Sequence, residues 1–135
     1  MEMIFKDKAF TATMDKNNKS FFAKQVGFVG TEEIKKYWLK IRDLILQNRI
    51  EKLFIDGSET KVMPVDAQKW FETEYFPSVA HLMAGRKLKI AQLQSEDVFS
   101  QLVGVKINKM ANQVTTGMQM QIFGNKQLAE EWLAA

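Results

Sequence analysis

Apolar and polar residues alternate along the first part of the chain in a pattern typical of β-strands. Residues 9–14 alternate and end in the turn-forming segment 15–18, and residues 20–29 form a second stretch of the same kind. The short turn between them predicts an antiparallel hairpin. A shorter strand at residues 3–5 is compatible with the same pattern.

The period of the pattern then changes from strand-like to helical. Ile34, Trp38 and Ile41 recur every three or four residues within the segment 31–49. Thr31 is a residue type that caps helices, and two acidic residues follow it, where they complement the positive end of a helix. The segment is therefore predicted to form a long amphipathic helix.

The second half of the chain alternates between short apolar runs and helical patterns. The near-continuous apolar run 50–57 predicts a buried parallel strand, and a polar loop is expected at 57–64. A helix opened by Asp66 is expected to end or bend at Pro77, because proline has no amide hydrogen to donate. The remaining segments predict a strand at 88–93, a helix beginning after 95–97, a strand at 117–123 and a closing helix capped by Asn125. Because Gly104 interrupts the helical pattern after residue 97, the sequence leaves open whether that helix reaches Ala111.

This order of elements predicts an α/β fold. A mixed, mostly parallel sheet would carry an antiparallel hairpin at its N-terminal side and about four helices, with right-handed crossovers between the parallel strands. A chain of 135 residues with 46% hydrophobic residues is of a size for one domain, so a single domain over residues 1–135 is expected.

Charge and residue usage restrict the classes of function. The 19 basic and 16 acidic residues are interspersed, with the densest basic cluster at 86–89, whereas nucleic-acid binders concentrate charge on one face. Cysteine is absent, which excludes disulfides and thiolate metal sites. No apolar run approaches the roughly 20 residues that span a bilayer, and the first residues lack the pattern of a signal peptide. We therefore expect a cytoplasmic protein that neither binds nucleic acid nor spans a membrane.

Motifs for catalysis or cofactor binding are also missing. The chain has neither a glycine-rich phosphate-binding motif nor a G-x-S-x-G nucleophile motif, and its single histidine, His81, has no acidic neighbour in sequence. No catalytic residue, cofactor or metal site is therefore predicted. An enzyme that works with carboxylates remains an alternative if Asp56, Glu59 and His81 converge in one cleft.

Two groups of residues are candidates for a binding role. Asp56, Ser58 and Thr60 follow the central strand, where ligands gather in open α/β sheets, and their hydroxyls could accept a phosphate. The alternative is a polar connection in which these side chains satisfy turn amides. Trp70 and Tyr75 could form a ligand-binding or partner-binding surface, or could pack in the core.

A carrier of a small lipid-like or aromatic molecule is a further alternative. Its binding site would lie between sheet and helices, near Phe21, Phe28, Trp70 and Tyr75, in a cavity of at least a few hundred Å³. A homodimer is also predicted as an option, because unpaired sheet edges need covering, with residues 9–14, residues 117–123 or a helical face as the contact.

Two motifs resemble those of small bacterial STAS-like proteins, whose fold is typified by the anti-sigma factor antagonists. The first is Trp70-Phe71 followed by Phe76-Pro77, and the second is Phe123, Asn125, Ala129 and Trp132-Leu133 at the chain end. The resemblance implies a STAS-like domain that regulates a protein partner without catalysis. In the antagonists a hydroxyl after the central strand is phosphorylated. Asp56 matches that turn, Gly57 replaces the usual hydroxyl, and Ser58 and then Thr60 are the candidates. The related CRAL-TRIO proteins bind lipids, which adds lipid binding as a side hypothesis.

Overall fold

The computed structural model describes residues 1–83, 85–114 and 117–135, and its central element is a six-stranded sheet with the strand order β1-β2-β3-β4-β5-β6. The first three strands pair in antiparallel fashion, whereas β4, β5 and β6 each run parallel to the strand before them. The strands are β1 (Glu2–Lys6), β2 (Phe10–Asp15), β3 (Ser20–Gly27), β4 (Lys52–Thr60), β5 (Leu88–Leu93) and β6 (Met118–Phe123). The predicted mixed sheet with its N-terminal antiparallel hairpin is confirmed.

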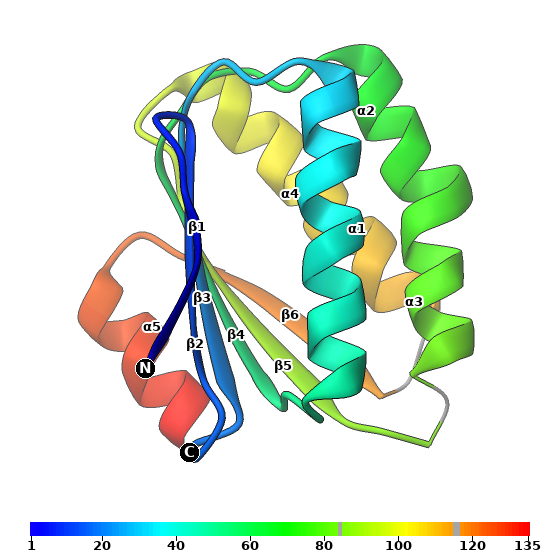
Figure 1. Ribbon diagram of the computed structural model, residues 1–135. Coiled ribbons are helices and arrows are strands. Elements are labelled where there is room, and N and C mark those ends of the chain that lie inside the picture. The colour runs from blue at the N-terminus through cyan, green and yellow to red at the C-terminus, as the bar shows by residue number, and fades with distance from the viewer. Residues whose placement is uncertain (84, 115–116) are drawn as a thin grey trace.

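Helices cover the sheet unequally on its two faces. Three helical segments lie on one face, and the C-terminal helix lies alone on the other (Figure 1). The helices are α1 (Thr31–Gln47), α2 (Val65–Trp70), the π-helical turn η1 (Phe71–Tyr75), α3 (Phe76–Leu82), α4 (Val98–Val114) and α5 (Lys126–Ala134). Because α2, η1 and α3 follow one another without a break, the described residues form four helical segments, in agreement with the prediction.

The main hydrophobic core lies between the sheet and the three helical segments. Phe10 and Phe21 from the strands and Ile34 and Ile41 from α1 are almost completely buried there. These residues occupy one side of each strand and one side of the helix, as the two periodicities in the sequence require. Burial of this apolar surface supplies most of the driving force for folding.

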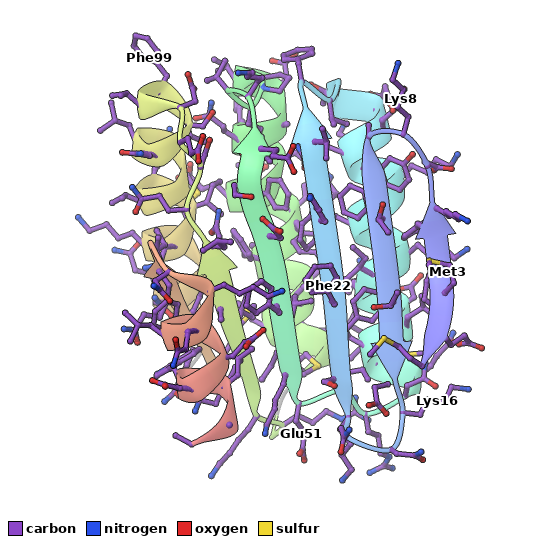
Figure 2. All side chains as sticks on the ribbon, turned by 90° about the vertical axis from the view of Figure 1, so that its left-hand side faces the viewer. Met3, Lys8, Lys16, Phe22, Glu51 and Phe99 are labelled. Carbon is purple, nitrogen blue, oxygen red and sulfur yellow. The ribbon has the colours of Figure 1, made fainter. Side chains whose placement is uncertain are left out.

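A second, smaller core lies under α5. It contains Phe54, Ala91, Ala129 and Leu133. Phe22 belongs to the same face but lies on the part of the sheet that α5 leaves uncovered, with its ring 5.5 Å from that of Phe54 (Figure 2). The two sheet faces are therefore covered by different amounts of helix.

The predicted helix caps are confirmed at two of four positions, Asn125 and the segment 95–97, where Asp97 accepts from the amide of Ser100. The side chain of Asn125 accepts a hydrogen bond from the backbone amide of Leu128 at 3.2 Å, so Asn125 caps α5 as expected. The predictions for Thr31 and Asp66 are wrong. Gly30 and Pro64 adopt the extended conformation that precedes a helix, so both helices begin one or two residues earlier than a cap at Thr31 or Asp66 requires.

The helix that contains Pro77 continues through this residue instead of ending there. The preceding turn is π-helical, and the amide of Phe76 donates to the carbonyl of Phe71. Proline cannot donate in the helical pattern, and the extra residue in the π turn accommodates its position. The wider turn also places the neighbouring residues Trp70 and Phe71, and likewise Tyr75 and Phe76, in the core together.

Two points that the sequence left open are settled by the strand order and by α4. Helix α4 continues through Gly104 and past Ala111. The sheet edges are β1 and β6, so residues 117–123 do lie at an edge. Residues 9–14 do not, because β2 is paired on both sides.

Candidate functional site

Strand β4 is longer than the sequence predicts and includes the segment 57–60, for which a loop is expected. A bulge in its pairing with β3 absorbs the change in register, and pairing resumes as far as Gly27 opposite Thr60. Asp56, Ser58 and Thr60 therefore lie on a strand, and their placement in a loop is wrong. They still lie at the carboxyl end of the parallel strands.

The hydroxyl groups of this segment are bonded within the segment itself. Both the amide and the Oγ of Ser58 donate to Asp56 Oδ1, at 3.0 and 2.6 Å. Thr60 Oγ1 donates to the carbonyl oxygen of Gly57 at 2.7 Å. The structure thus contains the polar connection that the sequence offered as the alternative interpretation.

The end of β4 is tied to the segment that precedes α4. Ser95 Oγ donates to the carbonyl of Thr60 at 2.9 Å, and the amide of Glu96 donates to the carbonyl of Ser58 at 3.3 Å. Asp97 then caps α4, because its Oδ2 accepts from Ser100 Oγ at 2.8 Å and from the Ser100 amide at 3.0 Å. These bonds from the Ser100 hydroxyl and amide lower the pKa of the Asp97 carboxyl. A displacement of Ser58 would therefore alter its hydrogen bond to Glu96, two residues before α4.

An ion pair joins β3 and β4 next to this segment. Lys24 Nζ lies 2.6 Å from Glu59 Oε2. The hydrogen bond to the Glu59 carboxylate, and then its charge, raise the pKa of the Lys24 ammonium. The pair lies on the sheet face that carries α5, opposite to the face covered by α1.

A cavity of about 110 Å³ lies on the other face, between the parallel strands and helices α1, α3 and α4. Its walls are mostly apolar, with contributions such as Ile55, Val79 and Ile107. Near the carboxyl ends of the strands its lining becomes polar, with Gln25 from β3 and Gln92 from β5. The volume is below the few hundred Å³ of a lipid-sized site.

The four aromatic residues proposed from sequence do not line one common site. Trp70 and Tyr75 are both buried, so neither offers an open partner surface. Tyr75 lines the cavity, whereas Trp70, Phe21 and Phe28 are not part of its wall. The Tyr75 hydroxyl donates to the carbonyl of Trp38 at 3.0 Å, and burial raises its pKa well above the ordinary value.

Exposed apolar side chains form a surface at the beginning of α4, which we call the α4 surface. It consists of Val98, Phe99, Leu102 and Val105, which are between 58% and 70% exposed. Phe99 projects from the end of the molecule at which the strands reach their carboxyl ends (Figure 2). Sequence reasoning missed this surface, because an apolar helical pattern by itself indicates burial and not exposure.

The carboxylates and the histidine of the enzyme hypothesis do not meet. Glu59 and its partner Lys24 lie on the α5 side of the sheet, whereas His81 is exposed on α3, on the other side (Figure 1). Among residues 1–83, 85–114 and 117–135, no three acidic or histidine side chains are grouped as metal ligands would be. Over the same residues, no helix combines the length and the apolar character needed to cross a membrane.

Comparison with known proteins supports the fold and no specific activity. No protein-family model and no curated protein matches the chain. Among solved structures, it is similar to an uncharacterised protein of the DUF3478 family from Shewanella loihica PV-4 described as having a SpoIIAA-like fold, with a TM-score of 0.60 and 15% identity over 97% of this chain and 98% of that one. At this identity the likeness establishes the fold alone. The STAS-like resemblance carried by the two sequence motifs is thereby confirmed, and the chain has a SpoIIAA-like, or STAS, fold.

Proposed function

We propose that this chain is a non-enzymatic regulatory domain in the cytoplasm that binds a protein partner through the α4 surface. The observation that carries the proposal is the exposure of Val98, Phe99, Leu102 and Val105 on two successive turns of one helix. Exposed apolar side chains that are contiguous commonly mark an interaction site, since burying each of them yields about 1.5–3 kcal/mol.

The charges of α4 indicate what kind of partner fits. Residues 98–114 contain no acidic side chain, and Lys106 and Lys109 are exposed on the turns that follow the α4 surface. A partner helix with an apolar face and acidic residues beside it would complement this arrangement. We therefore propose a protein partner of this chemistry rather than a nucleic acid or a second copy of the chain.

Ser58 is the proposed place at which the contact is regulated, with Thr60 as the second candidate. Its carbonyl accepts from Glu96, two residues before α4, so that β4 and the start of the α4 surface share a hydrogen bond. A phosphate on Ser58 would lie beside Asp56, whose Oδ1 is 2.6 Å from the Ser58 hydroxyl, and like charges repel. Phosphorylation would thus displace Ser58 from its present bonds and disturb the segment that precedes α4.

Site-specific photo-crosslinking in the native cells tests the proposal. A benzophenone amino acid replaces Phe99 in one strain and Leu128 in a control strain, because Leu128 is also exposed but lies on α5. We expect a protein adduct from position 99 that is absent from position 128. Leu102→Ser, added to the first strain, should weaken the contact about tenfold. Only lipid adducts, only adducts with the chain itself, or equal products from both positions would overturn the proposal.

A second candidate function, the carrier of a small molecule, is favoured by the cavity between sheet and helices. Its volume of about 110 Å³ is too small for a lipid chain but of the order of a cavity that accepts benzene, about 150 Å³. The carrier would thus hold a small, ring-sized molecule. Binding of any such molecule to the purified protein tests this candidate.

A further inference from the structure

The polar end of the cavity contains two glutamine side chains, Gln25 and Gln92, that make no hydrogen bond with the residues that the structure describes. Gln92 Oε1 is buried and has no hydrogen-bond partner. Gln25 is only 8% exposed, and its side chain makes no hydrogen bond to any of the described residues. Both residues line the cavity. A buried amide oxygen is nearly always bonded, so the unpartnered Gln92 Oε1 indicates a donor that is supplied from outside the chain, at a cavity that Gln25 also lines.

Two glycines from different elements keep the space beside Gln92 open. A Cβ at Gly57 on β4 would lie 3.8 Å from Gln92 Nε2, and one at Gly104 on α4 would lie 3.6 Å from the same atom. Both glycines line the cavity. Because neither adopts a positive φ, backbone conformation does not require glycine at these positions. At Gly57 a Cβ would also lie 3.0 Å from the carbonyl oxygen of Leu93, so close strand packing favours glycine there, whereas at Gly104 the missing side chain leaves space next to the amide.

The position of the amides relative to the apolar wall determines the class of ligand. Water alone would satisfy the two glutamines, but the rest of the cavity offers water few partners, since it is lined by side chains such as Ile55, Val79 and Ile107. An apolar body suits that end, and a group that both donates and accepts suits the amide end. A charged group is disfavoured, because Gln25 and Gln92 are neutral and the two cations of the lining are engaged elsewhere: Arg42 is bonded to Asp43 and Ser78, and Lys61 is exposed to solvent.

We infer that the cavity binds a neutral molecule of one aromatic ring with a hydroxyl group, a phenol in chemical class. The hydroxyl would donate to Gln92 Oε1 and accept from the Gln25 side-chain amide, while the ring occupies the apolar end. This inference rests on the carrier function proposed above and adds the identity of the polar group that selects the ligand.

Binding of three probes to the purified, refolded protein tests the inference. Phenol has the ring and the hydroxyl, toluene has the ring without a donor, and benzoate carries a charge. By isothermal titration or ligand-observed NMR, we expect phenol to bind about tenfold more tightly than toluene, because toluene leaves the amides unsatisfied, and benzoate to bind more weakly than both. In Gln92→Leu, the preference for phenol over toluene should fall to about one, while toluene still binds.

Two glycine-to-alanine variants, one inside the cavity and one outside it, test whether the probes occupy the cavity. Gly104→Ala adds one methyl group inside the cavity and should weaken phenol and toluene together, without unfolding the protein, because alanine favours a helix. Gly124→Ala is the control, since its Cβ would meet no atom within 4 Å, and it should change neither affinity. The inference is overturned, and the carrier function is retained, if toluene binds the wild type as tightly as phenol. The same holds if Gln92→Leu still binds phenol more tightly than toluene. If none of the three probes binds, the inference and the carrier function are both refuted.

Discussion

The hydroxyl group of Tyr37 on α1 is bonded to Asp7, between β1 and β2, and its removal gives a sharp test of the structure. Tyr37 Oη donates to Asp7 Oδ2 at 2.6 Å. The Tyr37 ring is buried, stacked on Phe10 with 4.5 Å between centroids and in edge contact with Phe5 at 5.0 Å. Because phenylalanine keeps both ring contacts, Tyr37→Phe removes only the hydrogen bond to the Asp7 carboxylate.

The pKa of Tyr37 sets an upper limit for the contribution of this bond. The hydrogen bond to Asp7, then desolvation and the negative charge of Asp7, raise the pKa of the Tyr37 hydroxyl from 10.0 to about 12. Two pKa units correspond to about 2.7 kcal/mol. The hydroxyl lies at the margin of the protein, where solvent screens the interaction, so we expect about 1–1.5 kcal/mol. With about 2.1 cal/mol/K of unfolding entropy per residue, this equals a Tm loss of roughly 3–6 °C.

The sign of the pH dependence follows from the raised pKa. The folded state holds the Tyr37 proton more tightly than the unfolded state does, so the stabilisation is complete below the unfolded pKa near 10. It is lost as the pH rises from 10 through about 12, because the ionised hydroxyl can no longer donate. The free-energy difference between wild type and Tyr37→Phe should therefore be constant from pH 7 to 9 and shrink above pH 10.

Urea unfolding of both proteins at pH 7, 9 and 10.5, followed by circular dichroism, measures this difference. The absorbance of the phenolate gives the pKa of Tyr37, since the chain has only two tyrosines and burial of the Tyr75 hydroxyl raises its pKa further than that of Tyr37. Equal stability of the two proteins at pH 7, or a difference at pH 10.5 that is unchanged from pH 7, would refute the assigned hydrogen bond.

Three further substitutions test the packing and the capping described above, each by urea unfolding at pH 7. Ile41→Ala removes a completely buried side chain of α1 and should cost about 2–5 kcal/mol, whereas Leu128→Ala at an exposed position of α5 should cost less than about 0.5 kcal/mol. Equal costs would contradict the placement of the core. Asn125→Ala removes the side-chain cap of α5 and should cost about 1 kcal/mol, and no loss would show that the cap is not formed. Tyr75→Phe removes the hydroxyl that donates to the Trp38 carbonyl and should also cost about 1 kcal/mol. An unchanged free energy of unfolding would show that this bond is absent.

Local patterns in the sequence were sufficient to predict most of the fold. The alternation in β2 and β3, the helical period of α1 and the cap at Asn125 each depend on a few neighbouring residues, and the structure agrees with them. The end of β4 was missed because a bulge keeps residues 57–60 paired with β3, and such pairing depends on a distant strand. The π turn before Pro77 was missed for a related reason, since tertiary packing of four aromatic residues favours a turn that local propensity does not.

The candidate site was harder to predict because it depends on distances between elements. Ser58 and Thr60 were singled out by residue type, and the structure shows that both hydroxyls already have partners inside β4. Gln25 and Gln92 carried no signal at all, since a glutamine in a strand is an ordinary surface residue until the fold buries it. Their importance arises only because β3, β5 and α4 enclose the same space.

Helix α4 connects the two proposed roles, since it has apolar residues on both its inner and its outer sides. Its inner side contributes Val103, Gly104 and Ile107 to the cavity, and its outer side carries Phe99 and Leu102 in the α4 surface. A helix that needed only to cover the sheet would gain nothing from exposed apolar residues in its first two turns, and exposure of such residues promotes aggregation. Because the helix is one rigid element, a ligand that shifts its inner side must also shift the outer one. Any coupling between partner binding and ligand binding through this helix has equal strength in both directions.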